Sequence, residues 1–242
     1  MIGLIGFGRF GALTAGYLAR DFPVYVYSRS QTAETIAGVG AASSTLEAVC
    51  RQAFVILSVP ISAMPGTLER IAPLLKPGSV VVDVCSVKIY PLQWMREYLP
   101  PHVHILGTHP MFGPDSAADS LEDRKLVLCP ERMPPKRYTR VRRYLEGKKL
   151  IVIETTPEDH DRQIAVSLSL THFIGRSLSA FGAEALEIDT EGYRRLVYTL
   201  GVVEHDSWQL FEDMHRYNPY ARQIRADFMQ AMRSIDEKLS PG

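Results

Sequence analysis

The sequence has few cysteines, no excess charge and no long apolar run, and each absence excludes a class of protein. Cys50, Cys85 and Cys129 are far apart, odd in number and in no C-x-x-C arrangement. Neither a disulfide framework nor a zinc knuckle is indicated, which suits a reducing cytoplasm. We therefore expect a cytoplasmic protein.

Charge and hydropathy exclude two kinds of large partner. Lys and Arg total 27, as do Asp and Glu, so no global field attracts nucleic acid or an anionic membrane. No continuous apolar run approaches the roughly 18 residues of a membrane span. The N-terminus has neither a basic region nor a cleavage site, so we expect the chain to begin inside its own fold. The expected partner is a small molecule.

The first motif is a glycine loop between a strand and a helix. The apolar run Ile2 to Ile5 meets Gly6-Phe7-Gly8-Arg9-Phe10-Gly11, and apolar residues then recur at helical spacing. In a dinucleotide fingerprint the first glycine makes the turn, the second lets the backbone approach a pyrophosphate, and the third lets helix and strand pack closely. We expect the whole loop, from Gly6 to Gly11, to bind the cofactor.

The end of the second strand indicates which cofactor. An acidic residue there binds the ribose hydroxyls of NAD, but the strand from Val24 to Tyr27 ends in Ser28-Arg29-Ser30. A guanidinium between two hydroxyls fits the 2′-phosphate of NADP. The alternative is a solvated loop arginine.

Alternating strands and helices continue through the first half and predict a doubly wound, mostly parallel sheet. The strand from Phe54 ends in Ser58-Val59-Pro60, which we also assign to the cofactor site because ligands bind beyond the carboxyl ends of such strands. The same rule applies to Ser86, after the strand from Ser79 to Val84, and to His109, after the strand from Val103 to Leu106. We expect Ser86 and His109 to face one crevice.

From Thr156 the pattern is helical, with Pro157 at a helix start, so we predict a Rossmann-type domain over 1–155 and a helical domain over 156–242. Asp161, His172 and Arg176 fall in an arc of roughly 80° on the first helix, at about 100° per residue. Amphipathic helices of this total length make a thin core alone. We predict that the helical half forms a homodimer.

Four blocks together resemble the prephenate and arogenate dehydrogenases of tyrosine biosynthesis. They are the glycine loop, Ser86-Val87-Lys88, Gly107 to Pro114, and Thr171 to Arg176. The last block, with Asp189 to Tyr193, is most similar to the arogenate-type, NADP-using branch. The resemblance implies NADP-dependent oxidative decarboxylation of arogenate to tyrosine, or of prephenate to 4-hydroxyphenylpyruvate. It covers nearly the whole chain, and the fused regulatory and mutase domains of some relatives are not expected.

The resemblance also implies roles for single residues. His109 matches the catalytic base, and an imidazole with a reference pKa of ~6.5 suits that task. Ser86 matches the serine that binds the substrate hydroxyl and orients the histidine. His172 and Arg195 match substrate anchors, although a one-residue slip would exchange Arg195 with Arg194. Asp161 is a candidate partner for the ammonium group of arogenate, or simply an acid that stabilises its helix.

Two other functions stay open at this point. Another NADP-dependent hydroxyacid or imine oxidoreductase would share the two-domain plan, but normally has a lysine on the long helix where this chain has His172. A non-enzymatic NADP-sensing protein would need neither Ser86 nor His109. No metal-ligand cluster is visible. The basic stretch from Lys136 to Arg143 is interpreted as a solvated helix face, because no aromatic platform accompanies it.

Overall fold

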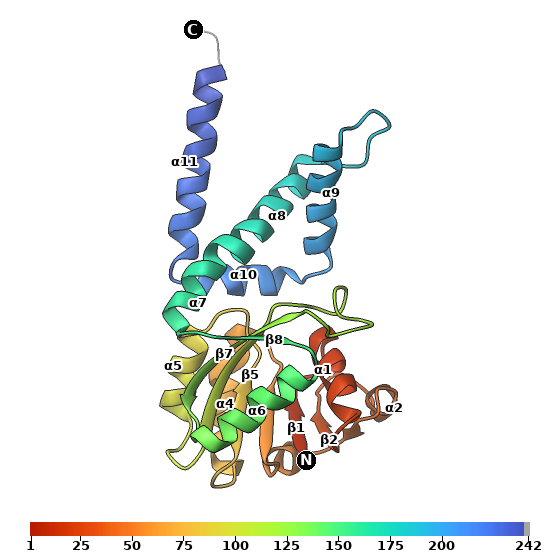
Figure 1. Ribbon diagram of the computed structural model, residues 1–242, viewed down its shortest axis with the longest axis vertical. Coiled ribbons are helices and arrows are strands. Elements are labelled where there is room, and N and C mark those ends of the chain that lie inside the picture. The colour runs from red at the N-terminus through yellow and green to blue at the C-terminus, as the bar shows by residue number, and fades with distance from the viewer. Residues whose placement is uncertain (240–242) are drawn as a thin grey trace. The chain divides into compact units, whose positions relative to one another are not determined.

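The computed structural model describes residues 1–239, with every side chain among them except that of Val202. The chain divides into two compact units, Met1–Pro157 and the residues from Glu158 onward. Figure 1 shows a sheet with helices in the first unit and helices alone in the second. Each unit is described by itself.

The first unit is built on one eight-stranded sheet in the order β3-β2-β1-β4-β5-β6-β7-β8. Strands β1 to β6 are parallel, β7 is antiparallel to β6, and β8 is parallel to β7. The strands are β1 Ile2–Ile5, β2 Val24–Tyr27, β3 Ala42–Ser43, β4 Phe54–Leu57, β5 Val80–Asp83, β6 His104–Pro110, β7 Lys125–Arg132 and β8 Ile151–Glu154. This confirms the predicted mostly parallel, doubly wound fold.

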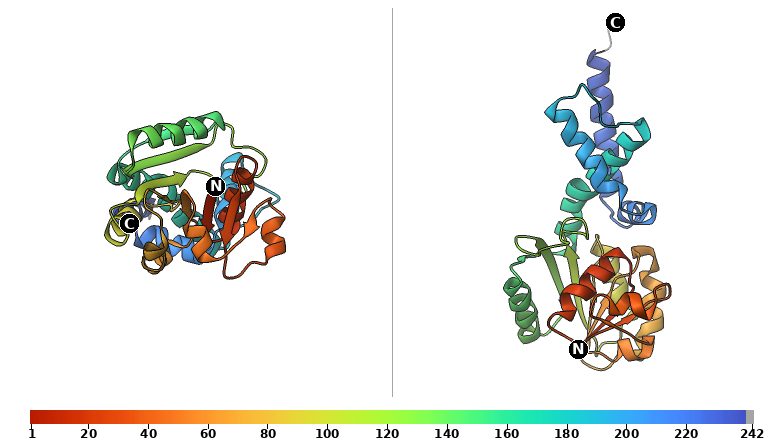
Figure 2. Two further views of the ribbon diagram at one scale, coloured as in Figure 1. Left: turned by 90° about the horizontal axis from the view of Figure 1, so that it is seen from below. Right: turned by 90° about the vertical axis from the view of Figure 1, so that its right-hand side faces the viewer.

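Helices cover both faces of this sheet, as parallel strands require. They are α1 Arg9–Ala19, α2 Ala33–Ala37, α3 Leu46–Cys50, α4 Met64–Ile71, α5 Ile89–Tyr98 and α6 Pro135–Gly147, with short 3-10 turns at Ile61–Ala63 and Ala72–Leu74. Helices α1 and α2 share one buried cluster with β1 and β2, and α6 packs on the same face farther along the sheet. Figure 2 shows α6 lying along one face of the sheet.

Two glycines let helices pack closely on the opposite face. A Cβ atom on Gly3 would lie 2.4 Å from the carbonyl oxygen of Val49 in α3. A Cβ atom on Gly107 would lie 2.9 Å from the side chain of Leu92 in α5. Helices α3 and α5 therefore pack directly on β1 and β6.

The sixth strand is longer than the sequence pattern indicated. The prediction ended the strand at Leu106 and placed His109 beyond it, whereas β6 runs to Pro110 and pairs His109 with Val127 of β7. Glycine and proline are poor strand formers, so the Gly107 to Pro110 stretch carried no strand signal. Hydrogen bonding to the antiparallel neighbour outweighs that preference.

The second unit consists of helices within its described residues. Helix α7 (Pro157–Ile164), a π-helical segment (Ala165–Leu170) and α8 (Thr171–Phe181) are contiguous, and α9 (Glu191–Glu204), α10 (Trp208–Arg216) and α11 (Ala221–Leu239) follow. Helix α9 ends at Glu204, and the Ser207 hydroxyl caps α10 by accepting from the Leu210 amide. A serine N-cap explains the break.

Candidate active site

The glycine loop has the geometry that its sequence predicts. Gly6 has a φ of +95°, and a Cβ atom there would lie 2.1 Å from the carbonyl oxygen of Ser58. A Cβ atom on Gly11 would lie 2.5 Å from the carbonyl oxygen of Gly6. The first glycine is therefore required for the turn, and the third for close packing of α1 against the loop.

Gly8 differs from these two because the space around it is open. No heavy atom lies within 4 Å of a Cβ atom built there, among the described residues. Gly8 is the N-cap of α1, no side chain caps this helix end, and its first turn has no acidic residue. The arrangement fits a pyrophosphate at the free amides of the helix N-terminus. Arg9, the first helical residue, is exposed, and its guanidinium lies 2.6 Å from the Asp115 carboxylate.

The other cofactor candidates follow β2 and β4, on either side of β1. The Ser28 hydroxyl accepts from the backbone amides of Ser30, at 3.3 Å, and Gln31, at 3.2 Å, which shapes the turn. Arg29 is exposed. Ser58 lies against Gly6, so Ser58 to Pro60 begin beside the glycine loop. The strand order reverses between β1 and β4, which is where ligands bind in open α/β sheets.

Ser86 and His109 come from neighbouring parallel strands. Strand β5 ends at Asp83, three residues before Ser86, and pairs with β6, which carries His109. His109 is 6% exposed. The Ser86 hydroxyl is buried and has no hydrogen-bond partner among the residues described. A buried hydroxyl in this state is free to bind a substrate group.

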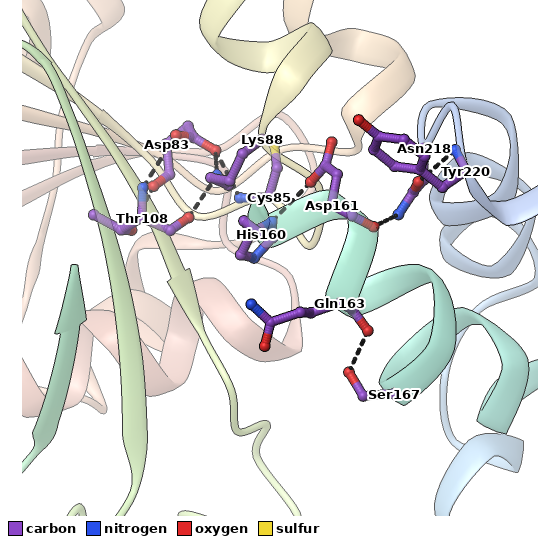
Figure 3. A network of polar contacts seen from close by, with 10 residues as sticks. All are labelled: Asp83, Cys85, Lys88, Thr108, His160, Asp161, Gln163, Ser167, Asn218 and Tyr220. Carbon is purple, nitrogen blue, oxygen red and sulfur yellow. Dashed lines mark hydrogen bonds and ion pairs between the residues drawn. The ribbon is translucent and has the colours of Figure 1, made fainter. Parts of the chain in front are cut away.

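A buried ion pair joins the two strands that carry these residues. Lys88 and Asp83 form it, and both side chains are 0% exposed. Lys88 Nζ also donates to the Thr108 carbonyl oxygen at 2.6 Å, while the Asp83 carboxylate accepts from the backbone amides of Cys85, at 3.0 Å, and Thr108, at 3.3 Å. Figure 3 shows this network. It fixes the backbone immediately before Ser86 and His109.

In the second unit, Asp161 and His172 of the predicted polar stripe are buried, and Arg176 is half-buried. Asp161, Ser169 and His172 are at most 5% exposed, although the π-helical segment interrupts the regular turn between them. Segments of π-helix frequently occur at functional sites. The side chain of Ser169 and Nδ1 of His172 have no hydrogen-bond partner within residues 1–239.

His172 lies in a cluster that the sequence did not reveal. Its Nε2 atom is 3.7 Å from the Asp206 carboxylate, and the Arg176 guanidinium donates to the Asp206 carbonyl and stacks on Trp208. Burial lowers the pKa of His172, which Asp206 opposes and Arg176 reinforces. This imidazole is therefore neutral near pH 7, so it can offer hydrogen bonds but no positive charge.

Asp161 and Arg195 have different surroundings. The Asp161 carboxylate lies 2.7 Å from Nδ1 of His160, and its carbonyl accepts from the Asn218 amide at 2.8 Å (Figure 3). The Arg195 side chain is 79% exposed and pairs with Glu191, which Arg194 also contacts. Arg195 is therefore not part of the buried His172 cluster.

Sequence reasoning missed several polar residues of these networks. Lys88 stood inside a recognised motif but was given no role, and Asp83 was read only as part of a strand. A charged residue that ends an otherwise apolar strand is the signal that would have identified Asp83. Asp206, between α9 and α10, and His215, in α10, carry no comparable signal.

Residues 1–239 hold no group of three or more His, Cys, Asp or Glu side chains placed to bind a metal. The helix Pro157–Phe181 is long and apolar enough to cross a membrane, with a mean hydropathy of 1.2 over its most apolar window. The sequence reading, which looked for continuous apolar runs, did not identify it. One such helix is weak evidence, because core helices pass the same test.

Comparison with known proteins decides the family. A family model described as the nucleotide-binding domain of prephenate dehydrogenase matches residues 17–154. Arogenate dehydrogenase 2 of Arabidopsis thaliana is 31% identical over 248 residues, which cover 98% of this chain and 69% of the relative. The chain belongs to the prephenate and arogenate dehydrogenase family. It is therefore a member of a family of oxidoreductases, as the four sequence blocks indicated.

Other members of the prephenate and arogenate dehydrogenase family show its extent. Arogenate dehydrogenase 1 of Arabidopsis thaliana is 31% identical over 250 residues, but the chain spans only 39% of its length. A second family model, the TYRAAT1-like C-terminal domain, matches residues 177–241. The match therefore extends into the helical half.

Solved structures of the family share the fold. The Synechocystis arogenate dehydrogenase is 25% identical, with a TM-score of 0.71 over 98% of this chain and 92% of that one. The A. aeolicus prephenate dehydrogenase, in complex with hydroxyphenyl propionate and NAD+, is 21% identical, with a TM-score of 0.76 over 97% of this chain and 88% of that one.

Proposed function

We propose that the protein is an NADP-dependent arogenate or prephenate dehydrogenase. One observation carries the proposal. Ser86 follows β5, and His109 lies near the end of the neighbouring strand β6. Both strands belong to the sheet whose first strand leads into the open glycine loop. Membership of the family supports the reaction class, and the nicotinamide cofactor would accept the hydride. The family comparison leaves the choice between NAD and NADP to the chain's own residues.

The proposed reaction needs only a base and a hydrogen-bond donor from the protein. His109 takes the proton of the substrate hydroxyl as hydride leaves the ring carbon that bears this hydroxyl. The ring carboxylate then departs as carbon dioxide, its bonding electrons make the ring aromatic, and the phenolate oxygen recovers the proton. Ser86 supplies a hydrogen bond to the reacting oxygen, which its unpartnered buried hydroxyl supports. Because aromatisation is downhill, no strong acid is needed, and positioning supplies most of the catalysis.

We assign substrate binding to His172, Arg195 and Asp161. The orphaned ring nitrogen of His172 supports a polar ligand there. Arg195 is exposed, so its pairing with Glu191 is readily exchanged for a substrate carboxylate. Asp161 is the least supported of the three, because His160 already occupies its carboxylate.

The cofactor preference rests on Arg29. Its exposed guanidinium follows β2, where an acidic residue would favour NAD, and Ser28 and Ser30 flank it. We therefore propose NADP as the preferred cofactor, bound by the residues of the glycine loop, Ser28 to Ser30 and Ser58 to Pro60.

The deciding experiment follows absorbance at the reduced-nicotinamide band with arogenate and prephenate, each against NADP and NAD. We expect turnover with NADP and one or both substrates, and much slower turnover with NAD. No turnover in any of the four reactions would contradict the proposal, and would favour the hydroxyacid or imine oxidoreductase, or the cofactor sensor. Binding of NADP alone does not separate these functions.

We further propose that the protein forms a homodimer through its helical unit. We also propose that it resides in a reducing compartment such as the cytoplasm. Large apolar side chains of this unit are exposed, including Phe181 at 84%, Ile188 at 93% and Leu239 at 77%. Covering them with a second copy would remove apolar surface from water. The three cysteines are buried and form no disulfide in the structure, which supports the compartment. A monomeric mass in solution scattering would contradict the dimer.

A further inference from the structure

The nucleotide-binding unit contains a large apolar cavity beside the glycine loop, and of its lining residues only Phe10 is also assigned to the cofactor site. Its volume is about 670 Å³, within the range of small-molecule pockets, which is roughly 300–1,000 Å³. Helices α1 and α6 wall it, and one face of the sheet forms its floor. The floor residues include Ile2, Phe54, Ile56, Val82 and Leu106.

The chain's path explains why this space is open. Helix α1 packs over β1 and β2, and α6 packs toward β7 and β8 on the same face. The helices that follow β4 and β5 belong to the other face, where α5 packs on β6 and contacts α4. Phe54 and Ile56 are consequently only partly buried, although β4 lies in the middle of the sheet. Side chains at the centre of a parallel sheet are normally covered on both faces.

The walls favour an apolar occupant over water. Phe10, Tyr17, Phe112 and Tyr144 add aromatic surface to the aliphatic floor. An ordered water needs two to four polar partners, and a wall of this kind offers few. An empty cavity would also leave the lining atoms without contacts on one side.

The polar lining is mainly cationic. Arg20, Arg140, Lys148 and Lys149 line the cavity, against the acids Asp119 and Glu122. Lys148 pairs with Asp21, and Lys149 pairs with Glu122. Among the described residues neither Arg20 nor Arg140 forms an ion pair, but the Arg20 guanidinium lies over the Tyr17 ring, 4.5 Å from its centroid, so the exposed guanidinium of Arg140 is the more available cation. An anionic head group would find its charge partner at Arg140.

We propose that this cavity binds a small amphiphile that has an apolar chain and a carboxylate head group, such as a medium-chain fatty acid. The apolar chain lies between α1 and α6 over β4, and the carboxylate pairs with Arg140. The cavity touches Phe10 of the glycine loop, and Thr108 and Pro110 on either side of His109. An occupant therefore contacts the segments that hold the candidate cofactor and base.

Calorimetric titration of the complete chain with dodecanoate, below its micelle concentration, tests this assignment without any assay of turnover. We expect saturable binding, weakened about tenfold by Arg140→Glu, because a charge-assisted contact is lost. The matched control is Arg143→Glu, since Arg143 is an exposed arginine of the same helix that does not line the cavity. Dodecan-1-ol, which has no charge, should bind both variants equally.

A second variant tests the cavity itself. Leu13→Trp places an indole in the space from α1, and should abolish binding of both dodecanoate and dodecan-1-ol while circular dichroism stays unchanged. No binding to the unmodified chain would overturn the proposal. Equal binding to all variants would also overturn it, because the ligand would then occupy another surface. The two arginine variants decide the matter even if Leu13→Trp fails to fold.

Discussion

The ammonium group of Lys88 is bound both by the Asp83 carboxylate and by the Thr108 carbonyl oxygen, at the point where β5 and β6 deliver Ser86 and His109. All three residues of this contact are buried. Lys88 therefore has a structural partner on each strand. Its place in the sequence block Ser86-Val87-Lys88 is explained by positioning and not by contact with substrate.

Removal of this lysine should destabilise the first unit strongly. Lys88→Met leaves the Asp83 carboxylate buried without its charge partner, which typically costs about 3–5 kcal/mol. The double variant Lys88→Met, Asp83→Asn removes both charges and keeps an acceptor oxygen for one of the two amides, those of Cys85 and Thr108, that bond to different carboxylate oxygens. It should recover part of the lost free energy of unfolding in urea titrations. Equal stability of Lys88→Met and the unmodified chain would refute the role of the pair.

Two glycines of the loop should respond differently to substitution, because Gly6 is needed for folding and Gly8 for binding of the cofactor. Gly6→Ala introduces a Cβ atom at a φ of +95° and 2.1 Å from a carbonyl oxygen, so we expect a loss of at least about 3 kcal/mol of stability. Gly8→Ala meets no atom within 4 Å among the described residues, and should fold normally. It should nevertheless bind NADP about tenfold more weakly, because the methyl group occupies the approach of the pyrophosphate. Thermal unfolding and cofactor titration of both variants check this contrast.

Arg29 should control the choice of cofactor. Arg29→Asp removes the proposed partner of the 2′-phosphate and adds a carboxylate that accepts from a ribose hydroxyl. Loss of a charge-assisted hydrogen bond weakens binding by roughly 10–100-fold. The KM for NADP should therefore rise by about that factor, while the KM for NAD falls. Arg143→Asp, an exposed arginine on α6, is the control. An unchanged ratio of the two KM values would make Arg29 an ordinary solvated side chain.

The helical unit should lose stability in mild acid. Burial, Arg225 and His172 lower the pKa of His215 from 6.5 to about 4. Arg225 donates to Nδ1 of this ring at 2.6 Å, which favours the neutral imidazole. As the pH falls from about 6.5 to about 4, the unfolded chain takes up a proton that the folded chain does not, so stability decreases over this window. Above the window His215 contributes no pH dependence.

Urea titrations at several pH values test that prediction. His215→Asn should make the loss of stability between about pH 6.5 and about pH 4 shallower, since one source of differential proton uptake is removed. His102→Asn, at an exposed position, should leave the slope unchanged. If both variants behave like the unmodified chain, burial of His215 does not determine the acid response.

Local signals identified the first half of the fold well. Gly6 and Gly11 each meet a distinct steric requirement, and Gly8 leaves open space at the start of the helix, so the spacing of the three glycines predicted strand, turn and helix. The extension of β6 through His109 was not predictable from local pattern, because it depends on pairing with β7, the next strand along the chain. Asp206 and His215 were missed for the same reason. Their roles come from contacts between helices and not from local pattern.

The most direct test compares the unmodified chain with His109→Asn in the presence of NADP and the substrate that it turns over. Asparagine keeps a polar side chain but provides no base, so the rate of nicotinamide reduction should fall by a factor on the order of 10²–10⁴, while NADP binds as before. A variant that binds NADP normally and reduces it at the original rate would contradict the assignment of His109 as the catalytic base.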